Sequence, residues 1–204
     1  MSKFQSLEYL KSGFHLFTQK PKKLLLFFVG IWFAAILLTP LPIVGSVCHF
    51  MLLIFAQAGA YLLIHNMATT TGDGDWDELK KLSPLSGQLI LAQVAYILLV
   101  IAGICFLILP GLYLVVSYLF FVPLVTLRGR TFWEALEESR RRVQKHWFAI
   151  AGFMLLLLLI NLVGAITIIG LLITAPTSAC ALYFAFQDLV QTEVIEVASV
   201  SHTQ

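Results

Sequence analysis

The stretch TFWEALEESRRRVQKHW, from Thr131 to Trp147, is the densest run of charge in a chain that is otherwise mostly apolar. Thr131 and Glu134 have the spacing of a capping box, in which two side chains satisfy backbone amides at the start of a helix. Apolar residues then recur at helical spacing and define one face: Phe132, Leu136, Val143 and Trp147. Because long apolar runs lie on both sides, we expect an amphipathic helix on a membrane surface that joins two transmembrane segments.

The polar faces of this expected helix carry acidic and basic residues that can form ion pairs. Glu137 with Arg141, and Glu138 with Arg142, are four residues apart. In both pairs the acidic residue comes first, which is the orientation that stabilises a helix. The sequence therefore predicts two ion pairs within this helix.

The composition of the whole chain is that of an integral membrane protein. Of its 204 residues, 59% are hydrophobic and 12% are charged, and the mean hydropathy is +0.90. Soluble domains carry about 25% charged residues. The length allows roughly six spans of about 20 residues each. The net charge of +2 and the lack of a basic soluble region argue against a nucleic-acid partner.

The apolar runs predict an all-α protein with six transmembrane helices arranged as three hairpins. The predicted spans are 24–38, 44–65, 88–109, a fourth from Pro110-Gly111 to 127, and two between 147 and 187. We expect turns at Thr39 to Pro42, at Pro110-Gly111, and between Asn161 and Gly170. The chain is thus divided into a cytoplasmic amphipathic segment (1–23), a six-helix membrane domain (24–187) and a cytoplasmic tail (188–204).

Residues 3 to 19 are expected to form a second surface helix. Its apolar residues recur at helical spacing: Phe4, Leu7, Leu10, Phe14 and Phe17. Pro21, flanked by lysines, then marks the water boundary before the first span.

The positive charges predict the orientation of the chain in the membrane. All 13 Lys and Arg lie in the N-terminal segment or in the second and fourth connections, and the other three connections have none. By the positive-inside rule, both termini and the two long connections should face the cytoplasm. The opposite side then shows only tight, uncharged turns.

The candidate contact site is the basic cluster around the charged helix. Its members are Arg128, Arg130, Arg140, Arg141, Arg142 and Lys145. Basic residues beside a span contribute about 1 kcal/mol each to the binding of anionic lipid headgroups. The alternative is that these residues only fix the orientation of the helices.

We expect no catalytic residues, no metal and no cofactor. No Ser/His/Asp set, P-loop, HExxH or nucleotide fingerprint occurs in the sequence. Asp73, Asp75 and Asp77 imitate the start of a calcium loop. However, Glu78 stands where the loop requires glycine, and Pro84 stands at its last ligand position.

Polar residues within the predicted spans are few and uncharged. They are Gln57, Tyr61, Gln93, Tyr96, Ser117, Asn161 and Thr167. No Asp, Glu, Lys or Arg occurs within these spans, which argues against an ion-coupled transporter. We expect the polar side chains to join helices by hydrogen bonds, with the lining of a substrate path as the alternative.

The C-terminal part of the sequence resembles a known group of proteins. The residues that carry the resemblance are LILPGLYLVVSYLFFVPLVTLRG (107–129), Ala135-Leu136 followed by Ser139, Trp147, Pro176, and Tyr183 to Asp188. They are similar to bacterial YciC-like inner-membrane proteins and to the membrane domain of some glycerophosphodiester phosphodiesterases. The resemblance implies a six-helix protein of the bacterial inner membrane. No catalytic residue carries over, because the phosphodiesterase chemistry belongs to a separate soluble domain.

These observations predict an integral inner-membrane protein without catalytic activity, acting as an accessory or lipid-interacting factor. Its expected partners are the bilayer with its anionic headgroups, and either a second copy of the chain or another membrane protein. The alternative is a small oligomeric permease or channel for a neutral or amphiphilic solute. Pro123 and Pro176 favour this alternative, because proline within a span can kink helices around a cavity.

Overall fold

The computed structural model of the chain describes residues 5–19, 21–39, 43–69, 76–106 and 108–201, and within these ranges it is helical without β-strands. The helices are α1 (Ser6–Gln19), α2 (Pro21–Leu38), α3 (Ile43–Thr69), α4 (Leu82–Phe106), α5 (Ile108–Ser117), α6 (Phe121–Arg128), α7 (Phe132–Gln144), α8 (Trp147–Ile166) and α9 (Ile168–Ser201). A short 3₁₀ helix, η1 (Trp76–Lys81), leads into α4. The predicted all-α class is confirmed for this part of the chain.

Six helical stretches in the described ranges are long and apolar enough to cross a membrane. In chain order they are Pro21–Leu38, Cys48–Thr69, Leu79–Phe106, Ile108–Arg128, Trp147–Ile166 and Gly170–Val190. They correspond one by one to the six predicted spans. The first predicted turn includes residues 40–42, which lie outside the described residues. The last turn lies at Thr167, within the predicted interval.

The turn between α4 and α5 lies earlier than predicted. Because α4 ends at Phe106 and α5 begins at Ile108, Pro110 and Gly111 lie in the first turn of α5 rather than between helices. Proline fits there, since the amides of a first turn have no acceptor within the helix. A Cβ at Gly103 of α4 would lie 3.0 Å from the Gly111 Cα, so the two glycines let the helices approach closely.

The fourth predicted span consists of two helices. Residues 118–120 form a turn that separates α5 from α6. Pro123 then lies in the first turn of α6, where proline is tolerated, so it does not kink a continuous helix. The sequence analysis missed this break because the whole segment is apolar.

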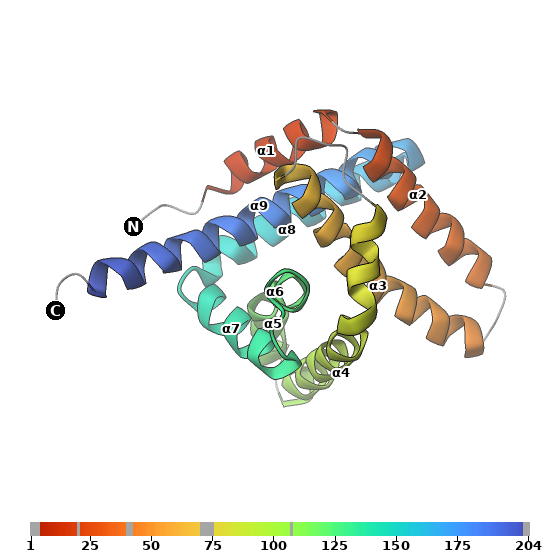
Figure 1. Cartoon of the computed structure of the whole chain (residues 1–204). Coiled ribbons are helices and arrows are strands. Elements are labelled where there is room, and N and C mark those ends of the chain that lie inside the picture. The colour runs from red at the N-terminus through yellow and green to blue at the C-terminus, as the bar shows by residue number, and fades with distance from the viewer. Residues whose placement is uncertain (1–4, 20, 40–42, 70–75, 107, 202–204) are drawn as a thin grey trace.

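Helix α1 packs along α9 (Figure 1), and its predicted apolar face is buried only in part, at Phe17. Leu7 and Phe14 are 64% and 52% exposed. The buried residues of α1 are Tyr9, Gly13, Leu16 and Phe17. A Cβ at Gly13 would lie 2.7 Å from the backbone nitrogen of Ala181, so close contact with α9 requires glycine and sets the rotation of α1.

The buried face of α7 also differs in part from the prediction. Its buried residues are Ala135, Leu136, Ser139 and Val143, whereas Phe132 is only partly buried. Trp147 begins α8, where its indole Nε1 donates a hydrogen bond to the carbonyl oxygen of Tyr113 at 3.3 Å. Figure 1 shows α7 running across the view beside α6, which is seen nearly end-on. Contact with α4, α5 and α6 therefore decides which side of α7 is buried.

Candidate functional site

The first candidate site is the basic helix α7, whose start has the predicted capping box. The Glu134 carboxylate accepts a hydrogen bond from the Thr131 backbone amide at 3.2 Å, and both halves of the box are present. The same backbone amide, followed by the Thr131 side chain, lowers the pKa of Glu134. The Phe132 amide donates to the Gln88 side-chain oxygen at 2.9 Å. Gln88 thus ties the start of α7 to α4, a role that the sequence did not reveal.

Both predicted ion pairs of α7 are confirmed, and each belongs to a larger group. Glu137 pairs with Arg141 and also with Arg140, each at 2.8 Å. Hydrogen bonds from Arg140 and then Arg141 lower the pKa of Glu137 to about 2, while the pKa of Arg140 is raised by Glu137. The carboxylate of Glu137 therefore stays ionised at neutral pH.

The second group joins α7 to the preceding loop. Glu138 pairs with Arg142 on the same helix and with Arg130 at 2.9 Å. The side chain of Arg142 is only 13% exposed, whereas those of Arg130 and Arg141 are 50% and 73% exposed. Of the six predicted contact residues, Arg142 is thus turned toward the protein, and Arg130 and Arg141 point outward.

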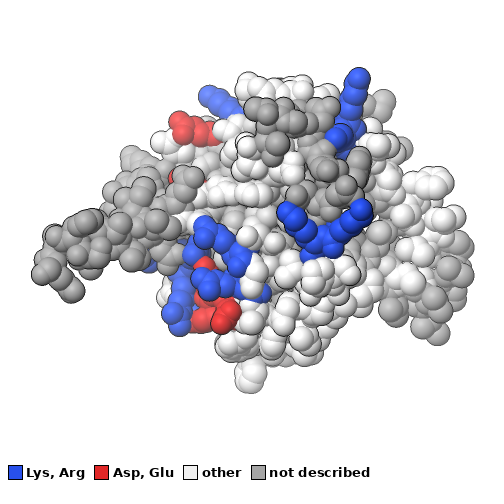
Figure 2. Space-filling view, viewed as in Figure 1, with Lys and Arg blue, Asp and Glu red and all other residues white. Residues whose placement is uncertain are grey.

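Basic side chains lie in several separate groups on the face of the molecule that Figure 2 shows. Figure 2 shows Lys and Arg over α7, near the start of α4 and near the start of α2. The acidic residues on α7 lie within the first of these groups. Between Arg128 and Lys145, six basic residues stand against three acidic ones, so this segment carries a net charge of +3.

A buried serine connects α7 to the break between α5 and α6. The Ser139 hydroxyl donates a hydrogen bond to the Ser117 carbonyl oxygen at 2.9 Å and accepts one from the Phe120 amide at 3.2 Å. These backbone groups have no partner in a helix, because the helix is interrupted there. The Ala-Leu-x-x-Ser pattern in the sequence was the signal for this contact. The structure shows that Ala135, Leu136 and Ser139 all lie on the buried face.

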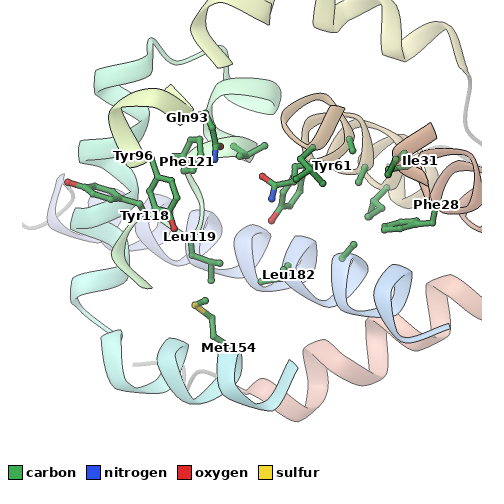
Figure 3. Close-up of a pocket in the computed structure, with 18 of the residues that line it drawn as sticks. Phe28, Ile31, Tyr61, Gln93, Tyr96, Tyr118, Leu119, Phe121, Met154 and Leu182 are labelled. Atoms are coloured by element: carbon green, nitrogen blue, oxygen red, sulfur yellow. The ribbon is translucent and has the colours of Figure 1, made fainter. Parts of the chain in front are cut away.

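The second candidate site is a cavity of about 550 Å³ between the helices. Figure 3 shows Phe28, Ile31 and Tyr61 on one side of it, and Gln93, Tyr96 and Tyr118 on the other. Its lining comes from α2, α3, α4, α5, α6, α8 and α9 and from the turn at residues 118–120. The volume lies within the range of about 300 to 1,000 Å³ that is typical of small-molecule sites.

The polar residues of the predicted spans divide between the two expected roles. Asn161 on α8 donates to the Ser178 hydroxyl on α9 at 2.7 Å, so it joins two helices as predicted. Gln57, Tyr61, Gln93 and Tyr96 instead line the cavity. These four residues therefore lie around a cavity, where the alternative role, the lining of a substrate path, would require them.

A third polar group lies where α1, α3 and α9 meet. The Tyr9 hydroxyl donates to the Asp188 carboxylate, and burial, followed by this hydrogen bond, raises the pKa of Tyr9. The Tyr183 hydroxyl lies 2.8 Å from His65 Nδ1 and accepts a hydrogen bond from the Gln187 amide at 2.9 Å. These bonds fasten α1 and α3 to α9, which continues beyond Gln187 as a helix to Ser201.

No group of three or more His, Cys, Asp or Glu side chains suited to a metal ion occurs among the described residues. The calcium-like run Asp73, Asp75 and Asp77 lies outside the residues whose side chains are described.

Comparison with protein-family models matches residues 79–203 to a family described as Domain of unknown function (DUF7847). The matched region begins in η1 and includes α4 to α9, and thus the whole of α7. No match was found among curated proteins or among solved structures.

Proposed function

The chain belongs to the DUF7847 family, whose function is unknown, and on this premise we propose that it is a non-catalytic integral membrane protein that binds anionic lipid headgroups. The proposed contact face is α7 with its flanking basic residues. The bacterial inner membrane is the proposed location, in keeping with the resemblance to YciC-like proteins.

The surface of the six apolar helices supports the membrane location. Large apolar side chains are widely exposed on them, including Phe33 (69%), Phe148 (86%) and Leu162 (63%). Soluble monomers rarely expose large contiguous apolar patches, whereas a lipid-facing surface must be apolar. Leu7 and Phe14 of α1 are exposed as well, which fits a helix that contacts the protein on one side and lipid on another.

The confinement of Lys and Arg to the N-terminal segment and to two of the connections supports the proposed orientation. The basic groups on the face seen in Figure 2 belong to segments that precede or join the apolar hairpins. By the positive-inside rule this face is cytoplasmic, together with both termini. The cytoplasmic leaflet carries the negative surface potential that attracts such segments.

The observation that carries the lipid proposal is the outward exposure of Arg130, just before α7, and of Arg141, in the last turn of α7. Each guanidinium is positioned by a glutamate on one edge and has five N–H donors in total. Donors that the glutamate does not use can bind a phosphate oxygen, and such charge-assisted bonds are strong. The net charge of +3 on this segment adds a favourable field.

The test replaces Arg130 and Arg141 with glutamine and leaves the mostly buried Arg142 unchanged. The protein is placed in nanodiscs of mixed phosphatidylglycerol and phosphatidylcholine, and retained lipids are counted by native mass spectrometry. We expect the double variant to lose its preference for phosphatidylglycerol while its membrane insertion remains intact. Lys80→Gln with Lys81→Gln is the matched control, because it removes two charges away from α7. Unchanged retention in the Arg130/Arg141 variant would reject the proposal.

The cavity favours a second candidate, a small permease for a neutral or amphiphilic solute. Its lining comes from all three apolar hairpins, which a path between helices requires. Solute flux into liposomes that contain the purified protein tests this candidate. Solute flux equal to that of empty liposomes would reject the permease and leave lipid binding as the proposed function.

A further inference from the structure

The interhelical cavity has one apolar wall and one polar wall. The residues that α2 contributes are all apolar: Phe28, Ile31, Trp32 and Ala35. The two residues that α4 contributes, Gln93 and Tyr96, are both polar. Figure 3 shows Phe28 and Ile31 toward one end of the space and Gln93 and Tyr96 toward the other. A ligand that fits both walls must itself be polar at one end and apolar at the other.

The two glutamines in the lining are available to a ligand. The side-chain amides of Gln57 and Gln93 make no hydrogen bond with any described residue. Each amide offers two donors and one acceptor. A polar group surrounded by apolar helices is costly unless it is hydrogen-bonded. A ligand with a hydroxyl, ester or amide group would supply the missing partners.

The charge of the lining limits the ligand further. Among the described residues that line the cavity, none is Asp, Glu, Lys or Arg, and His49 on α3 contributes the one imidazole. A charged group would enter this space without an opposite permanent charge to compensate for its lost hydration. The polar end of the ligand is therefore uncharged.

We propose that this cavity binds an uncharged amphiphile, with its polar group at Gln57 and Gln93 and its apolar chain against α2. The site is independent of the proposed lipid contact on α7, because no residue of α7 is part of the described lining. It also differs from a transport path, since binding alone requires no opening on the opposite side.

The experiment uses the full chain in detergent-free nanodiscs with a monoacylglycerol that carries a photoactivatable diazirine in its chain. Cross-linked residues are identified by mass spectrometry. We expect labelling on α2 and α3 at the cavity, near Ile31 and Leu53. Unlabelled monoacylglycerol should compete at least about tenfold better than oleate at pH 9, which is ionised, or octadecene, which has no polar group. Labelling elsewhere on the protein, or equal competition by oleate, would overturn the proposal.

Variants test the polar end separately. Gln57→Leu and Gln93→Leu keep the side-chain volume and remove the hydrogen bonds. Each should weaken competition by monoacylglycerol about twofold to tenfold, the range expected for one neutral hydrogen bond, and leave competition by octadecene unchanged. Gln19→Leu on the surface of α1 is the matched control and should have no effect. Wild-type competition in the Gln57/Gln93 double variant would overturn the proposal.

One further variant keeps the two proposed sites distinguishable. The Arg130→Gln and Arg141→Gln protein should retain normal labelling at the cavity even if it loses phosphatidylglycerol. If the Gln57→Leu and Gln93→Leu variants fail to fold, the positions labelled in the unchanged protein still test the proposal, because that experiment requires no substitution.

Discussion

Ser139 donates its hydroxyl hydrogen to the carbonyl oxygen of Ser117, 22 residues earlier in the chain, at 2.9 Å. The same hydroxyl accepts from the Phe120 amide, so one buried side chain satisfies both edges of the break between α5 and α6. Tyr118 and Leu119, within this break, line the cavity. Ser139 therefore connects the basic helix α7 to the part of the cavity wall formed by this break.

Ser139→Ala should destabilise the protein by roughly 1 to 3 kcal/mol, the cost of leaving buried polar groups unsatisfied. Reversible unfolding in mixed micelles measures the loss. Ser86→Ala is the control, because the Ser86 hydroxyl bonds the Ser83 carbonyl at an exposed site. If Ser139→Ala lowers the free energy of unfolding no more than Ser86→Ala does, the hydrogen bonds of Ser139 contribute nothing to stability.

Gly13→Ala should loosen α1 from α9. The added Cβ would lie 2.7 Å from the Ala181 backbone nitrogen, and a backbone cannot move aside as a flexible side chain can. Hydrogen exchange of the α1 amides should become faster while exchange in α8 stays unchanged. Gly30→Ala is the matched control, since nothing lies within 4 Å of its added Cβ. Faster hydrogen exchange of α1 in both variants would contradict the explanation that the added Cβ of Gly13→Ala collides with α9.

Glu137 should remain ionised well below the usual range. Its pKa is about 2, against an ordinary value of 4.5, because Arg140 and Arg141 donate hydrogen bonds to it. When folding lowers the pKa of a carboxyl group, the ionised group stabilises the folded state at any pH above the pKa that it has in the unfolded chain. This stabilisation is lost as the pH falls to the pKa that the group has in the folded protein. We therefore expect the contribution of these ion pairs to stability to decrease as the pH falls from 4.5 to about 2.

The carboxyl ¹³C shift of Glu137, followed by NMR, tests the titration. Arg140→Gln combined with Arg141→Gln should move the midpoint back toward 4.5. A midpoint near 4.5 in the unchanged protein would show that the two arginines do not hold the carboxylate in solution.

Asn161→Leu should weaken the contact between α8 and α9. Hydrogen bonds between helices in a membrane contribute about 0.6 kcal/mol on average. A double-mutant cycle with Ser178→Ala isolates the bond that joins the two side chains at 2.7 Å. A coupling energy of zero would mean that each side chain finds another partner when its present one is removed.

Local features were predicted well because their causes lie within a few residues. The capping box of Thr131 and Glu134 and the Glu137–Arg141 pair depend on spacings of three and four residues along one helix. The six apolar runs were also predictable, because length and composition define them. The spacing of apolar residues could not predict how α1 and α7 are rotated about their own axes, because each helix has apolar residues on more than one side.

The sequence by itself determined the helical class, the six apolar helices, the restriction of Lys and Arg to the segments outside the predicted spans, and the short-range pairs on α7. Only the tertiary structure decided which face of α1 is buried, where the fourth apolar stretch breaks, and which polar residues line a cavity. The physical reason is distance along the chain. Gly13 meets Ala181, Ser139 bonds Ser117, and the walls of the cavity come from seven helices, so these features exist only once remote segments pack together.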